Sequence, residues 1–171
     1  GDIMFKTYGI IKKWHIAGFF WIVIVGSLLH FTYEWSGNSR IVGYFSPVNE
    51  SLWEHLKLGY FSLTFFTLIE FWVLRNKTNT YFIAKAAGII SMSIFVILVS
   101  YIYEIITKDS NAFFHICLFI LGAFICQFVS INIMKLNLSK RVNIYGIVAY
   151  LILGILLIAL TPYQLETFFY L

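Results

Sequence analysis

The side chains of this chain that could do chemistry are histidines and carboxylates, which bind divalent metals and exchange protons. Seven of them fall near the ends of long apolar segments, and these are His30, Glu34, Glu50, Glu54, His55, Glu104 and His115. His30 and Glu34 are four residues apart, so they share one face of a helix. Ionisable groups at such positions usually face a protein interior or an aqueous cavity rather than lipid. We therefore expect these residues to form one functional polar layer.

Three of the four histidines belong to this layer, and histidine with carboxylate is a common ligand set for catalytic zinc. We predict that a divalent metal such as zinc is held by His30, His55 and His115, or by two of them and a glutamate. Such a metal keeps a position for water and lowers its pKa enough for hydrolysis near neutral pH. Glu54 or Glu50 would act as general base. The groups expected to bind the substrate are Glu34, Asn49, Trp53, Lys57 and Glu104.

Structural interpretations of the same residues remain open. Ser51 and Glu54 have the spacing of a capping box, so Glu54 could serve only to begin a helix. Glu50 could pair with Lys57, and Arg40 could neutralise Glu34. The same acidic layer could also be the binding site of a small-molecule or ion transporter, or of its membrane subunit. Two further alternatives are a non-catalytic assembly partner and a haem protein with histidine ligands.

The elements that must position these residues are membrane-spanning helices. The chain has 171 residues, of which 60% are hydrophobic and 12% are charged. Soluble domains average about 45–50% apolar and about 25% charged residues, so the composition excludes a cytosolic globular protein and a nucleic-acid-binding module. Apolar stretches of about 20 residues predict an all-α, polytopic bundle of five transmembrane helices. They lie near 16–35, 51–74, 81–106, 112–134 and 142–161.

The basic residues predict how the bundle is threaded, because Lys and Arg accumulate in cytoplasmic loops. Nine of the 12 basic residues lie before the first span or around the turns near 75–85 and 135–141. This distribution predicts that the N-terminus is inside and the C-terminus outside, with the histidine layer at the outer boundary. The expected location is the cell membrane, which the chain crosses several times, with membrane lipid as a partner.

Several local features carry expectations of their own. Residues 1–3 are expected to be a cloning remnant before Met4, so that 4–171 form a single transmembrane domain. Ser46 and Pro47 predict a helix start, as an N-cap followed by proline at the first helical position. Glu70 is expected to reach the membrane surface beside Arg75. The aromatic tail at 164–171 is expected to lie along the outer surface.

Three polar residues are expected to have structural roles. Gln127 and Ser130 predict interhelical hydrogen bonds. His15, next to Trp14, predicts an anchor at the membrane interface.

Two segments carry a resemblance to a known family. GSLLHFTYEWSGN at 26–38 and FSPVNESLWEHLK at 45–57 resemble an uncharacterised family of small integral-membrane proteins of Gram-positive bacteria. The resemblance is most specific over these residues and implies that the cluster of histidines and glutamates is a family pattern. It implies a bacterial plasma membrane as the location, and it implies no activity. The arrangement is also loosely similar to alkaline ceramidases, which hold zinc with histidines from several helices, although this chain lacks their paired histidines on a late helix.

Together these observations predict a membrane-embedded, metal-dependent hydrolase or transferase. Its substrate would be a lipid or membrane-anchored molecule at the outer leaflet, because the expected site lies at the outer ends of the first four spans.

Overall fold

The protein is a bundle of helices, seen in a computed structural model that describes residues 2–161. The helices are α1 (Asp2–Trp35), α2 (Arg40–Gly43), α3 (Leu52–Leu74), α4 (Tyr81–Thr107), α5 (Ala112–Met134) and α6 (Val142–Ala159). All but α2 are long and apolar enough to cross a membrane, and the described residues contain no strand. The expected all-α class and the five long apolar helices are therefore confirmed, as in a multi-pass membrane protein. The tail at 164–171 lies outside the described residues.

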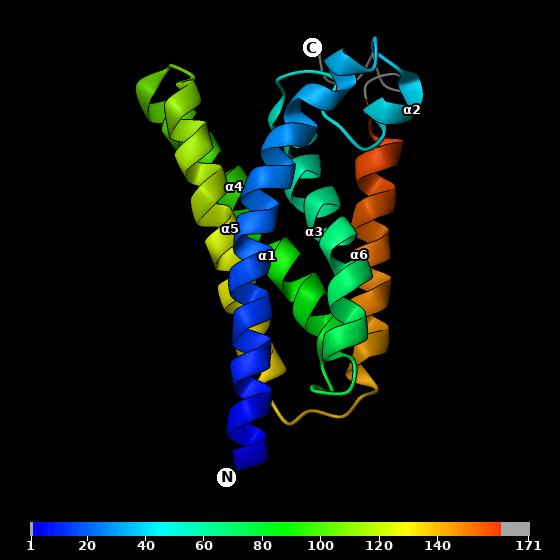
Figure 1. The fold of residues 1–171 in the computed structure, drawn as a ribbon. Coiled ribbons are helices and arrows are strands. Elements are labelled where there is room, and N and C mark those ends of the chain that lie inside the picture. Colours follow the sequence, from blue (N-terminus) through cyan, green and yellow to red (C-terminus); the bar gives the residue numbers. More distant parts are fainter. Residues whose placement is uncertain (1, 162–171) are drawn as a thin grey trace.

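The helices form a bundle that is open at one end. In Figure 1, α4 and α5 form a hairpin whose connecting turn diverges from α2 and the upper end of α1. Lower in the bundle, α4 contacts both α5 and α6, while α1 contacts α3 and α5. We call the end that holds α2 and the start of α3 the histidine end. The opposite end, with the α3–α4 and α5–α6 turns, is called the basic end.

Apolar contacts along the bundle centre hold the long helices together. Ile22 of α1, Leu63 of α3 and Leu157 of α6 are completely buried in one cluster. A second cluster at the basic end includes Leu74 and Ala84. Large exposed apolar side chains cover the outside of the helices, as expected for surfaces that face lipid.

Glycines allow two of the helix pairs to approach closely. A Cβ added to Gly88 of α4 would lie 2.6 Å from the backbone oxygen of Cys126 in α5. A Cβ added to Gly146 of α6 would clash with the backbone of Phe82 and Ile83 at the start of α4. Small residues have this function in membrane bundles, because helices in lipid associate through close van der Waals packing rather than through the hydrophobic effect.

Gly146→Ala is therefore expected to destabilise the protein by about 1–3 kcal/mol, because the added methyl group must push α6 away from α4. Gly9→Ala is the matched control, since nothing lies within 4 Å of a Cβ added there. Thermal unfolding of both variants in detergent measures the difference. Equal melting temperatures for the two variants would contradict the close contact between α4 and α6.

The beginning of α3 differs from the sequence-based expectation. The helix starts at Leu52, and its N-cap is Ser51, whose hydroxyl accepts a hydrogen bond from the Glu54 backbone N–H. The prediction of a start at Ser46 and Pro47 is wrong. The Ser46 hydroxyl instead donates to the Leu29 carbonyl oxygen, which ties the α2–α3 loop to α1.

Candidate metal centre

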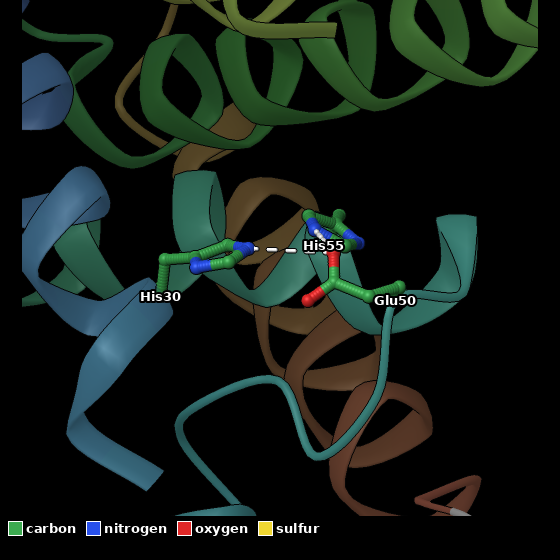
Figure 2. A group of neighbouring side chains, drawn as sticks. All are labelled: His30, Glu50 and His55. Carbon is green, nitrogen blue, oxygen red and sulfur yellow. Dashed lines mark ion pairs between the residues drawn. The ribbon is translucent and has the colours of Figure 1, made fainter. Parts of the chain in front are cut away.

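The central feature of the histidine end is a group of three potential ligands from three different segments. His30 lies near the end of α1, Glu50 in the loop before α3, and His55 in the first turn of α3. One ligand atom from each residue lies within 4.8 Å of the other two. Figure 2 shows both imidazole rings next to the Glu50 carboxylate, with dashed lines marking the two His–Glu ion pairs.

The two His–Glu distances in this group are compatible with ligands around a small ion. Glu50 Oε2 lies 3.5 Å from His30 Nε2 and 3.2 Å from His55 Nε2. Ligand atoms bound to tetrahedral zinc at about 2.0–2.2 Å are separated by roughly 3.4 Å. The two His–Glu distances therefore fit a shared Zn²⁺, and two histidines with one glutamate are a known set of catalytic zinc ligands.

The backbone orients His55 for this role. His55 Nδ1 lies 2.8 Å from the Ser51 carbonyl oxygen, to which it donates its hydrogen. Nε2 faces Glu50, and it carries the lone pair that a metal needs in the neutral form of the ring. Metal-binding histidines are typically fixed in this way by a hydrogen bond from the second ring nitrogen. Ser51 thus begins α3 and also orients a candidate ligand.

The site is open to a substrate on the side of Glu50. The Glu50 side chain is 81% exposed, while those of His30 and His55 are 31% and 27% exposed. His30 Nδ1 is buried and has no hydrogen-bond partner among the described residues. A backbone hydrogen bond therefore orients His55 on the protein side, and the carboxylate side of the group is accessible.

A buried ion pair holds the loop that carries Glu50. Lys57 and Glu54 are both fully buried, with Nζ and Oε2 2.8 Å apart. Lys57 Nζ donates to the Gly43 carbonyl oxygen and to Thr161 Oγ1, and Glu54 Oε1 accepts from the Val48 backbone N–H. The pair thus links Gly43 and Val48, which precede Glu50, to the beginning of α3, which follows it. Glu54, one of the two residues expected to act as general base, is engaged by these contacts, and Lys57 pairs with Glu54 rather than with Glu50.

The structure separates His115 from the other two histidines. His115 Nε2 lies 3.6 Å from Glu104 Oε1 and 3.3 Å from Ser110 Oγ, at the diverging end of the α4–α5 hairpin (Figure 1). It is not part of the metal-ligand group of His30, Glu50 and His55. The two-histidine-plus-glutamate form of the predicted site is therefore the one whose residues lie together.

The remaining predicted substrate-binding residues are only partly brought to this end of the bundle. Glu34 is exposed one turn beyond His30 on α1. The Asn49 side chain accepts a hydrogen bond from the Ser51 backbone N–H, within the loop. Trp53 packs against the core, and its indole N–H has no partner among the described residues. Glu104 lies with His115, away from this site.

A second polar cluster, at the basic end, is absent from the sequence-based site. Glu70 of α3 is fully buried, with Oε2 2.6 Å from Lys85 Nζ of α4. The Tyr81 hydroxyl donates to the same oxygen at 3.0 Å. The expectation that Glu70 reaches the surface beside Arg75 is wrong, because Lys85 of the next helix neutralises it inside the bundle.

His15 is also more buried than expected for an interfacial anchor. It is 3% exposed, and its ring bridges the Ile11 carbonyl oxygen and Ser130 Oγ of α5. The Gln127 amide donates to the His15 carbonyl oxygen at 2.8 Å. The interhelical hydrogen bonds expected for Gln127 and Ser130 are thus present, and His15 is their partner on α1.

Comparisons with known proteins place the chain in a family without assigning it an activity. No curated protein and no solved structure matches it. Residues 3–169, nearly the whole chain, match a family of unknown function, DUF6512. The chain, with its five long apolar helices and its cluster of histidine and glutamate, therefore belongs to the family of unknown function DUF6512.

Proposed function

We propose that this protein is a membrane-embedded, metal-dependent hydrolase or transferase that acts on a lipid or membrane-anchored substrate. The observation that carries the proposal is the convergence of His30, Glu50 and His55 from three segments, with two His–Glu distances that fit zinc ligands. These residues are expected to hold a divalent metal such as zinc. Bound there, the metal supplies a Lewis acid and lowers the pKa of a coordinated water to about 7.

Glu50 and Glu54 have different roles in the proposed reaction. Glu50 Oε2 faces both imidazoles, and the Glu50 side chain is 81% exposed, so we assign the role of proton acceptor to its other oxygen, Oε1. The Glu54–Lys57 pair positions the loop that bears Glu50. Glu54 therefore acts through Glu50, as a positioning residue.

The location of the cluster favours a substrate that the membrane presents. His30 and His55 lie at the ends of two helices long enough to span a membrane. On α1, exposed Phe31 and Trp35 stack on each other with ring centroids 5.8 Å apart. Aromatic side chains favour the membrane–water interface, where lipid headgroups and anchored groups are found. The predicted threading puts this interface on the outer side.

The test uses vesicles of total bacterial membrane, which carry both lipids and anchored peptides. Purified protein loaded with Zn²⁺ is expected to release products that mass spectrometry detects, at a rate at least about 100-fold above that of Glu50→Gln. A chelator should abolish the release, and zinc should restore it. His115→Ala is the matched control and should retain the wild-type rate. Equal product patterns for wild type and Glu50→Gln would overturn the proposal, as would zinc transport without hydrolysis.

A further inference from the structure

A cavity lies at the basic end of the bundle, far from the candidate metal centre. Its volume is about 120 Å³, and it opens between α3, α4 and α6. The residues around it include Tyr81, Phe82 and Lys85 of α4 and Ile147, Tyr150 and Leu151 of α6. Tyr81 and Phe82 belong to the first turn of α4, so the cavity lies near the boundary of the hydrocarbon region.

The walls of the cavity suit an acyl chain. Leu151 is 56% exposed and Ile147 is 37% exposed, on a helix long and apolar enough to span a membrane. Their exposed surfaces therefore face lipid, and the cavity opens sideways into the membrane. The charge of Lys85, which lies beside the cavity, is neutralised by Glu70. A lipid chain can thus enter without displacing water from an uncompensated ion.

The loops next to the cavity suit an anionic headgroup. Lys140 and Arg141 are exposed immediately before α6, and Ile147 follows Arg141 by six residues, or about 9 Å along the helix. The α3–α4 turn adds Arg75 and Lys77, and neither turn contains an acidic residue. Basic pockets between transmembrane helices are typical sites for anionic lipid headgroups.

We propose that this end of the bundle binds an anionic phospholipid. A segment of one acyl chain occupies the cavity between α3, α4 and α6, and Lys140 and Arg141 bind the headgroup phosphate. The site is separate from the candidate metal centre and does not depend on the proposed hydrolysis.

Native mass spectrometry of delipidated protein in detergent tests the proposal. The probes are phosphatidylglycerol, phosphatidylcholine with the same acyl chains, and glycerol phosphate as the headgroup alone. We expect one phosphatidylglycerol per chain, bound roughly 10-fold or more tightly than phosphatidylcholine. Leu151→Trp fills the cavity that receives the acyl chain and should abolish this tight binding of phosphatidylglycerol. Ile155→Trp, one turn along α6 and also exposed, is the matched control and should keep it.

A second variant avoids any effect on packing. Lys140→Gln combined with Arg141→Gln changes exposed side chains, so it should fold normally and bind both phospholipids equally. The proposal is overturned if the two tryptophan variants bind phosphatidylglycerol alike, or if the double variant keeps the wild-type preference. Binding of glycerol phosphate as tight as that of phosphatidylglycerol would also overturn it, because the cavity would then contribute nothing to the affinity.

Discussion

His55→Ala is expected to lower the affinity for Zn²⁺ by about 100-fold or more, and His30→Ala is expected to do the same. Each substitution removes one imidazole from a group in which Glu50 Oε2 lies 3.5 Å and 3.2 Å from the two histidines. Two remaining ligands hold zinc poorly, because most protein sites supply three or four. Competition between the purified protein and a chromophoric chelator measures the affinity.

His115→Ala provides the control for this experiment. Its imidazole pairs with Glu104 on the α4–α5 hairpin, so its loss should leave the affinity for zinc unchanged. All three variants should have the helicity of the wild type, since each histidine is only partly buried. A loss of affinity in His115→Ala as large as that in His55→Ala would contradict the assignment and restore the three-histidine site.

Lys85→Met is expected to destabilise the protein by about 3–5 kcal/mol, the second large effect. The substitution leaves the Glu70 carboxylate fully buried without its cation, and Tyr81 supplies only one hydrogen bond to it. Glu70→Gln should destabilise the protein as well, because Lys85 then becomes the unpaired charge. Equilibrium unfolding in detergent with increasing denaturant measures these changes.

The double variant Glu70→Gln, Lys85→Met distinguishes a buried ion pair from ordinary packing. Removing both charges also removes their desolvation cost, so the double variant should recover most of the stability lost in either single variant. Destabilisation equal to the sum of the two single effects would show that the charges do not interact. The cycle therefore measures the coupling directly.

The bundle could be predicted from sequence because membrane spans depend on local composition. The apolar runs near 112–134 and 51–74 become α5 (Ala112–Met134) and α3 (Leu52–Leu74). The start of α3 was harder to locate, because two serines in the same loop can act as N-caps. Ser46 is engaged by the Leu29 carbonyl oxygen of α1, a tertiary contact that no local pattern reveals.

The candidate site could be predicted only in its residue types. The capping-box interpretation of Ser51 and Glu54 is half correct. The Ser51 hydroxyl accepts a hydrogen bond from the Glu54 backbone N–H, as the box requires. The Glu54 carboxylate, however, accepts from the Val48 backbone N–H and not from that of Ser51. The grouping of His30 with His55 requires the α1–α3 contact, and the separation of His115 requires the divergence of the α4–α5 hairpin. These are properties of helix packing, which spacing along one helix does not encode.

The buried Glu70–Lys85 pair shows the same limit. Arg75, the cation nearest to Glu70 in sequence, lies over the Trp72 ring, with its guanidinium carbon 4.8 Å from the ring centroid. Lys85, on the next helix, forms the ion pair with the Glu70 carboxylate instead. The available signal was the pair of ionisable residues about one turn inside two consecutive spans, which is costly unless they meet.

X-ray absorption of the zinc-loaded wild-type protein tests the central claim, a metal held by His30, Glu50 and His55, most directly. We predict one zinc per chain with four nitrogen and oxygen neighbours at about 2.0–2.2 Å, two of them imidazoles. The scattering from the second imidazole should disappear in His55→Ala and persist in His115→Ala. Absence of stoichiometric zinc, or an unchanged spectrum in His55→Ala, would contradict the claim.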